Sequence, residues 1–167
     1  MSCRRLVWGL LLLLGGTPAA ADEPPAAPAA AVGPAALGKR LYREGQLVSG
    51  QPLAATLASG VRIEGRAAAC ATCHRNSGLG AAEGANVIRP LTVPGFFAGQ
   101  ENNRRYARRP WVLRGELNYT DATFERALRE GVSADGRPLD PLMPRYALAR
   151  IDIEALRAYL TQVALQP

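Results

Sequence analysis

Residues 70–74 of this 167-residue chain read Cys70-Ala71-Thr72-Cys73-His74, a C-x-x-C-H sequence. Two thiols at this spacing can form thioether bonds with the two vinyl groups on one edge of a porphyrin. The histidine after the second cysteine is then held beneath the iron, where its imidazole serves as an axial ligand. The sequence therefore predicts one covalently attached haem c, held by Cys70 and Cys73, with His74 as the proximal ligand.

Other uses of this cysteine pair fit the chain less well. A structural zinc site usually needs four nitrogen or sulfur ligands, and beyond the N-terminal segment the only residues of the Cys/His type are Cys70, Cys73 and His74. A thioredoxin-like redox pair would begin a helix in a βαβ pattern, which the sequence does not show. A disulfide between the two cysteines would give His74 no role.

The second axial ligand has few candidates. His74 is the only histidine, and Met143 is the only methionine apart from Met1. Prolines on both sides of Met143 stiffen its segment and keep it out of a helix, so that its thioether could be held against iron. The alternative is that Met143 only fills a gap in the core. Lys39, the only lysine, is a poor substitute.

The N-terminus has the three parts of a secretory signal. Arg4 and Arg5 supply the positive charge, residues 6–14 (LVWGLLLLL) form the apolar region, and cleavage is expected near Ala21. The apolar run is shorter than the roughly 20 residues that span a bilayer. We expect export to the periplasm, and membrane association only if the leader is uncleaved. A twin-arginine signal is the alternative, although haem c is attached after translocation.

The signal sequence and the composition after it divide the chain into three segments. Residues 1–21 are the expected signal peptide, 22–34 form an Ala/Pro-rich linker, and 35–167 form one domain. The linker has too few large apolar groups to bury a core, and it is either a spacer or a disordered remnant of processing. The domain has few aromatic residues, so a haem would serve as a large apolar filler.

The pattern of apolar residues indicates a mainly helical domain. Helices are expected from Pro34 to Gly45, over residues 120–130 and over residues 152–165, where apolar residues recur at helical spacing. Start and stop residues mark the ends of the first two. Alternating apolar residues between 53 and 63, interrupted by a turn, indicate a short β-hairpin before the haem motif. The alternative for this stretch is an irregular loop.

At this point the chain resembles the class I c-type cytochrome family, over roughly residues 35–165. Gly38 and Tyr42 match the small and aromatic residues of the family's N-terminal helix, and Tyr159 matches the aromatic of its C-terminal helix. The resemblance implies an all-α fold, the small cytochrome c fold, in which these two helices cross and a haem forms the core. Here it would carry the hairpin as an insertion.

The resemblance also implies ligand roles outside the C-x-x-C-H motif. Met143, followed by Pro144, matches the family's distal loop. Pro90, preceded by Arg89, matches a proline whose carbonyl accepts the hydrogen bond from the proximal histidine, and Arg89 and Pro90 are therefore expected at the cofactor. The chain departs from the compact family pattern by longer segments over residues 43–69 and 96–119.

An arginine-rich stretch, NNRRYARRPW, carries most of the local positive charge of a chain whose net charge is +6. Its arginines or Trp111 could hydrogen-bond the haem propionates. The arginines could instead form a landing site for an acidic redox partner, or the loop could simply be solvated. An exported haem protein has little access to nucleic acid, so nucleic acid is not an expected partner. The arginines in question are Arg104, Arg105, Arg108 and Arg109.

The expected function is one-electron transfer in the periplasm between a redox donor and a redox acceptor, without catalysis by the chain itself. One alternative is the electron-accepting cytochrome subunit of a periplasmic dehydrogenase or of a sulfur-oxidising complex. Another is a haem enzyme or gas sensor with an open distal position. Methionine ligation would raise the reduction potential and favour the ferrous form.

Overall fold

The computed structural model of the chain describes residues 32–83, 86–93, 95–97 and 118–164. Several sequence-based predictions fall outside these ranges. They are the signal peptide over residues 1–21, all but the end of the linker, the arginine-rich stretch at 104–109, and Trp111. The residues described here belong to one compact unit, Val32–Pro167.

The three long helices lie where the sequence indicates them, and α1 and α4 have clear local start and stop signals. Helix α1 spans Pro34–Glu44, with a proline in its first turn and Gly45 in the left-handed conformation at its end. Helix α4 spans Asp121–Glu130, and helix α5 spans Arg150–Ala164. Proline is preferred at the first turn and glycine just after the last one, so both ends of α1 and the C-terminal end of α4, at Gly131, follow from the residues themselves.

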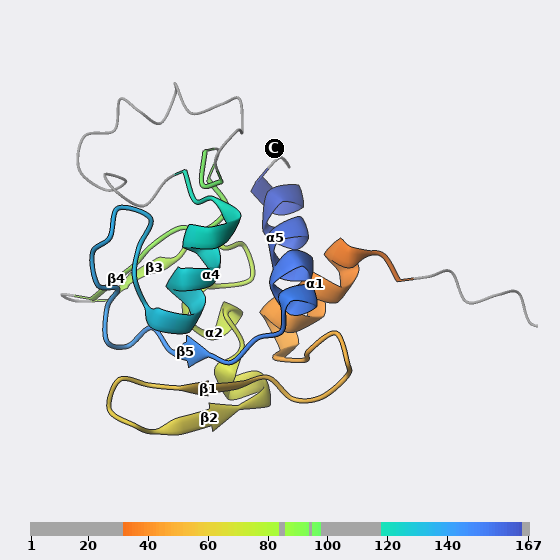
Figure 1. Cartoon of the computed structure of the whole chain (residues 1–167), viewed down its shortest axis with the longest axis horizontal. Helices are drawn as coiled ribbons and strands as arrows, with labels where there is room; N and C mark the ends of the chain where they lie inside the picture. The colour runs from red at the N-terminus through yellow and green to blue at the C-terminus, as the bar shows by residue number, and fades with distance from the viewer. Residues whose placement is uncertain (1–31, 84–85, 94, 98–117, 165–167) are drawn as a thin grey trace, which may run out of the picture. The chain divides into compact units, whose positions relative to one another are not determined.

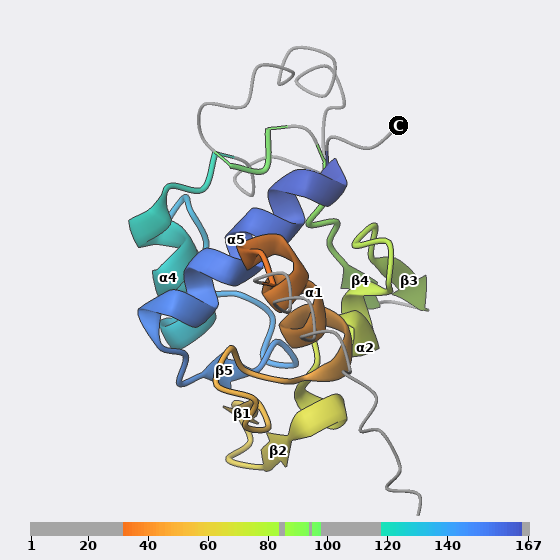
Figure 2. The ribbon, with the colours of Figure 1, turned by 90° about the vertical axis from the view of Figure 1, so that its right-hand side faces the viewer.

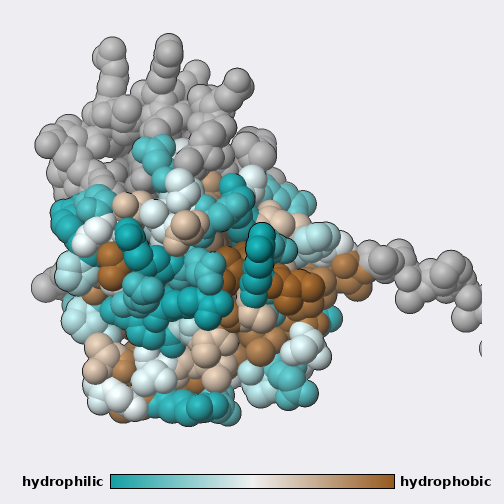
Figure 3. Space-filling model, in the orientation of Figure 1, coloured by the Kyte–Doolittle hydropathy of each residue, from teal (hydrophilic) through white to brown (hydrophobic). Residues whose placement is uncertain are grey.

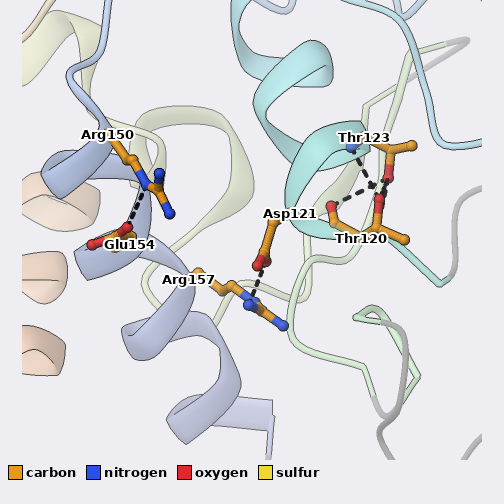
Figure 4. Close-up of polar contacts among 6 residues, drawn as sticks. All are labelled: Thr120, Asp121, Thr123, Arg150, Glu154 and Arg157. Atoms are coloured by element: carbon orange, nitrogen blue, oxygen red, sulfur yellow. Dashed lines mark hydrogen bonds and ion pairs between the residues drawn. The ribbon is translucent and has the colours of Figure 1, made fainter.

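Side-chain contacts fix the start of α4 and join it to α5 (Figure 4). Thr120 caps α4 by accepting a hydrogen bond from the Thr123 backbone N–H at 3.2 Å, and the Thr123 hydroxyl accepts one from the Thr120 N–H at 2.9 Å. This reciprocal arrangement is a capping box. Asp121, in the first turn of α4, forms an ion pair with Arg157 of α5, so the start of α4 is tied to the terminal helix.

Helices α1 and α5 cross in close contact (Figures 1 and 2). A Cβ atom on Gly38 would overlap the Ala155 carbonyl of α5, so only glycine allows this approach. The rings of Tyr42 and Tyr159 pack next to this point, with centroids 5.3 Å apart. Figure 3 shows hydrophobic residues gathered over α1 on the face that it views.

Two small antiparallel sheets accompany the helices. Strands β1 (Ala54–Thr56) and β2 (Arg62–Glu64) form the hairpin that the alternation indicated, and β5 (Arg145–Tyr146) pairs with the other edge of β1. A second hairpin joins β3 (Ala81–Glu83) to β4 (Asn86–Ile88).

The expected all-α cytochrome c fold is therefore wrong for this chain. The cause lies in the segments between the helices, which pair as strands in both sheets. Strand β5 is two residues long and its partner β1 is far away in sequence, so no local periodicity could indicate it. None of the helices in the described ranges combines the length and the apolar character needed to cross a membrane.

We predict that Gly38→Val lowers the free energy of unfolding by about 2 kcal/mol or more, since overpacking a tight contact typically costs about 1–3 kcal/mol. The added side chain would force α1 away from the Ala155 backbone. Urea denaturation of the purified protein measures the effect. Gly33→Ser is the matched control, because a Cβ at Gly33 meets nothing within 4 Å. Equal unfolding midpoints for the two variants would contradict the prediction.

Candidate haem site

The C-x-x-C-H motif forms a compact helical turn. A short 3₁₀ helix (Gly65–Ala68) leads into it, and α2 (Ala71–His74) contains all of the motif except Cys70. The backbone N–H of His74 donates to the Cys70 carbonyl at 2.9 Å. Both cysteines are free thiols, Cys70 buried and Cys73 exposed. The turn therefore brings two unpaired thiols and one imidazole together at a boundary between core and solvent.

The imidazole of His74 is oriented by a backbone carbonyl. Its Nδ1 lies 2.9 Å from the carbonyl oxygen of Arg89, and the side chain is buried. Because a carbonyl only accepts, Nδ1 carries the proton and Nε2 keeps its lone pair for a metal. Burial lowers the pKa of His74, against an opposing effect of the Arg89 hydrogen bond. The hydrogen bond thus fixes the tautomer and burial favours the neutral ring, and both leave the imidazole able to bind iron.

The acceptor for this hydrogen bond is Arg89, not Pro90 as the resemblance implied. Arg89 follows the last residue of β4 and precedes a proline, which holds it in an extended conformation. In that position its carbonyl faces His74, while Pro90 itself lines the wall of the neighbouring cavity. The proline thus contributes by fixing the residue before it.

A cavity of about 760 Å³ opens beside the motif. That volume lies within the roughly 300–1,000 Å³ typical of cofactor and ligand pockets. Cys70, Cys73, His74 and Met143 all line it, although the last is far from the others in sequence. The remaining wall is mostly apolar and includes Phe96, Phe124, Ala127, Leu128, Leu156 and Leu160. These residues fit a large, flat, apolar group with a metal at its centre.

The apolar surroundings of the cavity also change the pKa of the Cys70 thiol. Burial raises its pKa to about 12, so this thiol is uncharged near neutral pH. Uncharged sulfur packs against an apolar group without the cost of burying a thiolate. Cys73, by contrast, lies at the surface, so a group bonded to both cysteines would have one edge near solvent.

Two buried tyrosines hold the motif from either side. The Tyr146 hydroxyl donates to the Ala68 carbonyl at 3.1 Å, and the Tyr42 hydroxyl donates to the Arg75 carbonyl at 2.9 Å. Burial raises the pKa of both phenols, which therefore stay protonated and able to donate. Sequence reasoning missed this role of Tyr146, because its contact is with a backbone atom 78 positions away.

The Met143 segment is held by its main chain. The Met143 N–H donates to the Asp140 carbonyl at 2.9 Å, and the Met143 carbonyl accepts a hydrogen bond from the Arg145 guanidinium. Met143 is half-buried and packs against the core. The structure therefore places the predicted distal ligand at the cavity wall on a constrained loop.

Polar groups on the cavity wall include two arginines, Arg89 and Arg137. Arg137 forms an ion pair with Asp135 at 2.6 Å, and the buried Ser133 hydroxyl also bonds Asp135, at 2.5 Å. Guanidinium groups suit carboxylates such as haem propionates. Sequence reasoning named Arg89 at the cofactor and missed Arg137; Trp111, also named, lies outside the described ranges.

Comparison with known proteins gives one informative relative. No family model and no solved structure matches the chain. The chain is similar to the cytochrome subunit of a fructose dehydrogenase from Gluconobacter japonicus, with 33% identity over 99 residues. The alignment takes in 56% of this chain and 18% of that protein, so the chain spans less than a fifth of its relative's length. The similarity supports a cytochrome, a protein that carries electrons on haem.

Proposed function

We propose that this protein is an exported electron carrier with a single covalent haem c, bonded to Cys70 and Cys73 and ligated by His74 and Met143. The observation that supports this most is the shared cavity. It collects both thiols, the imidazole and the sole thioether of residues 32–167 on one largely apolar wall. The similarity to a cytochrome subunit supports the same class of function.

Haem iron supplies reversible one-electron chemistry when it is bound, and the residues of this chain set the conditions for it. His74 is held in one tautomer by Arg89, so it presents Nε2 without rotating. The apolar wall would exclude water from the iron's surroundings, and the Met143 thioether would supply a second ligand. Methionine ligation stabilises the ferrous state and raises the potential.

The proposed site of exchange is the edge near Cys73, because this cysteine is exposed whereas Cys70 is buried. Two apolar side chains of the cavity wall are also well exposed, Leu142 at 62% and Val87 at 51%. An exposed edge with apolar neighbours suits brief contact with a redox protein. Donor and acceptor proteins in the periplasm are the proposed partners, reached after cleavage of the leader near Ala21.

A second candidate is suggested by the relative's name, which describes a subunit of a dehydrogenase. This chain could likewise take electrons from a separate catalytic subunit in the periplasm. The cavity, the thiols and Met143 would serve both roles, since the chain carries electrons in each case. Copurification of the tagged chain with a larger redox subunit would favour this candidate over a free shuttle.

We predict that Cys70→Ala combined with Cys73→Ala abolishes covalent haem, because the two thioether bonds are the only covalent attachment proposed. Acid–acetone extraction and haem staining of denaturing gels measure the bound cofactor. Cys3→Ala is the control and should leave staining unchanged, because Cys3 lies within the leader. Haem that stays with the double variant through extraction would disprove thioether attachment.

We predict that Met143→Ala keeps covalent haem but loses the ferric sulfur-to-iron charge-transfer band in the near infrared. The potential should fall and imidazole should bind, because the iron would lose its proposed second ligand. Leu142→Ala, a change of the exposed neighbouring side chain, is the control and should keep the band. An unchanged band and potential in Met143→Ala would show that this methionine only fills space.

A further inference from the structure

We propose that Arg145 is the positioning residue of the distal methionine, acting through the Met143 carbonyl rather than through the cofactor. The inference rests on the proposed His74 and Met143 ligation and adds a residue that sequence reasoning did not single out. Its basis is a set of contacts that joins Arg145 to the Met143 loop, to the end of α4 and to the central strand of a sheet.

The first contact reaches the methionine itself. The Arg145 guanidinium donates through Nη1 to the Met143 carbonyl, while the Met143 N–H is bonded to the Asp140 carbonyl. The main chain of Met143 is thus fixed on both sides. Pro144, which is buried, restricts the conformation of Met143 further. A flexible thioether keeps one direction only if its backbone is held, since methionine has three rotatable side-chain bonds.

The second contact locates the guanidinium. A Cβ atom on Gly131 would overlap Cζ, Nε and Nη2 of Arg145, so the guanidinium lies directly against this glycine. Gly131 ends α4 in the left-handed conformation, with φ at 72°. The C-terminal end of a helix attracts cations through its unpaired carbonyls and its dipole. Among the described residues Arg145 forms no ion pair with a carboxylate, and its guanidinium instead lies against this helix end and donates to the Met143 carbonyl.

The third contact links the two sides of the cavity. Strand β5 contains only Arg145 and Tyr146, which pair with Thr56 and Ala55 of β1. Tyr146 donates to the Ala68 carbonyl, two residues before the attachment cysteines begin. The same two-residue strand therefore contacts the attachment segment through Tyr146 and the distal segment through Arg145.

Arg145 is not among the residues that line the cavity, whereas its neighbours Met143, Pro144 and Tyr146 are. It is therefore badly placed to bind the cofactor directly. It would act on the cofactor only by fixing the position of the Met143 backbone. Arg89 and Arg137 differ in this respect, because both line the cavity and could bind haem propionates directly.

The test compares Arg145→Leu, which keeps the apolar stem and removes the donor, with Arg145→Lys, which keeps a donor. Each variant is purified with haem attached, and three quantities are measured: the near-infrared sulfur–iron band, the potential, and imidazole affinity. Arg145→Leu should weaken the band, lower the potential and bind imidazole about tenfold more tightly, the factor expected for loss of one charged hydrogen bond. Arg145→Lys should restore part of each change.

Arg129→Leu is the matched control. Arg129 lies in the last turn of α4, close in sequence to Gly131, but its guanidinium donates to the Leu148 carbonyl and not to the Met143 segment. Its loss should reduce stability and leave band, potential and imidazole affinity unchanged. If Arg145→Leu does not accumulate, Arg145→Gln, whose amide is too short to reach, tests the same contact.

The outcomes distinguish this inference from the proposed ligation. A wild-type protein with the sulfur–iron band, together with an Arg145→Leu variant that matches Arg129→Leu in all three measurements, overturns the positioning role alone. A wild-type protein that lacks the band, and in which Met143→Ala changes nothing, overturns the His/Met ligation and this inference with it.

Discussion

The close approach of α1 and α5 at Gly38 is the constraint on which the site depends. Without a Cβ at Gly38, α1 lies directly against the Ala155 backbone. This places Tyr42 of α1 at the cavity wall, where its hydroxyl holds the Arg75 carbonyl just after His74. The attachment motif is thus oriented by a helix that is itself positioned by one missing methyl group.

The helices and the attachment motif could be predicted from the sequence because their signals are local. Pro34 and Gly45 mark the ends of α1, and the Thr120 cap marks the start of α4. Of the sheet formed by β1, β2 and β5, only the β1–β2 hairpin could be predicted from the sequence. Strand β5 exists because Thr56 and Arg145 pair across most of the domain, and such pairing leaves no periodic pattern in two residues.

The same division applies to the site. Cys70, Cys73, His74 and Met143 were accessible to sequence reasoning because side-chain chemistry and the scarcity of other candidates point to them. The Arg89 carbonyl was not, because every residue has a carbonyl and only the folded backbone decides which one faces His74. Arg145 was missed for a related reason, since its effect depends on Gly131 and the Met143 backbone, which meet it only in the folded chain.

Cofactor binding in the proposed site would also be coupled to folding. Its wall takes Tyr42 from α1, Phe124 from α4, Leu156 from α5 and Met143 from the loop before β5. An unfilled apolar cavity destabilises a protein in proportion to its volume, because its lining loses packing contacts. A haem that filled this cavity of about 760 Å³ would restore those contacts. Because the proposed thioether bonds would keep it on the unfolded chain as well, its contribution to folding would be the packing and ligation gained inside the cavity. A domain with so few large aromatic residues would therefore complete its core with the same group that serves as its proposed redox centre.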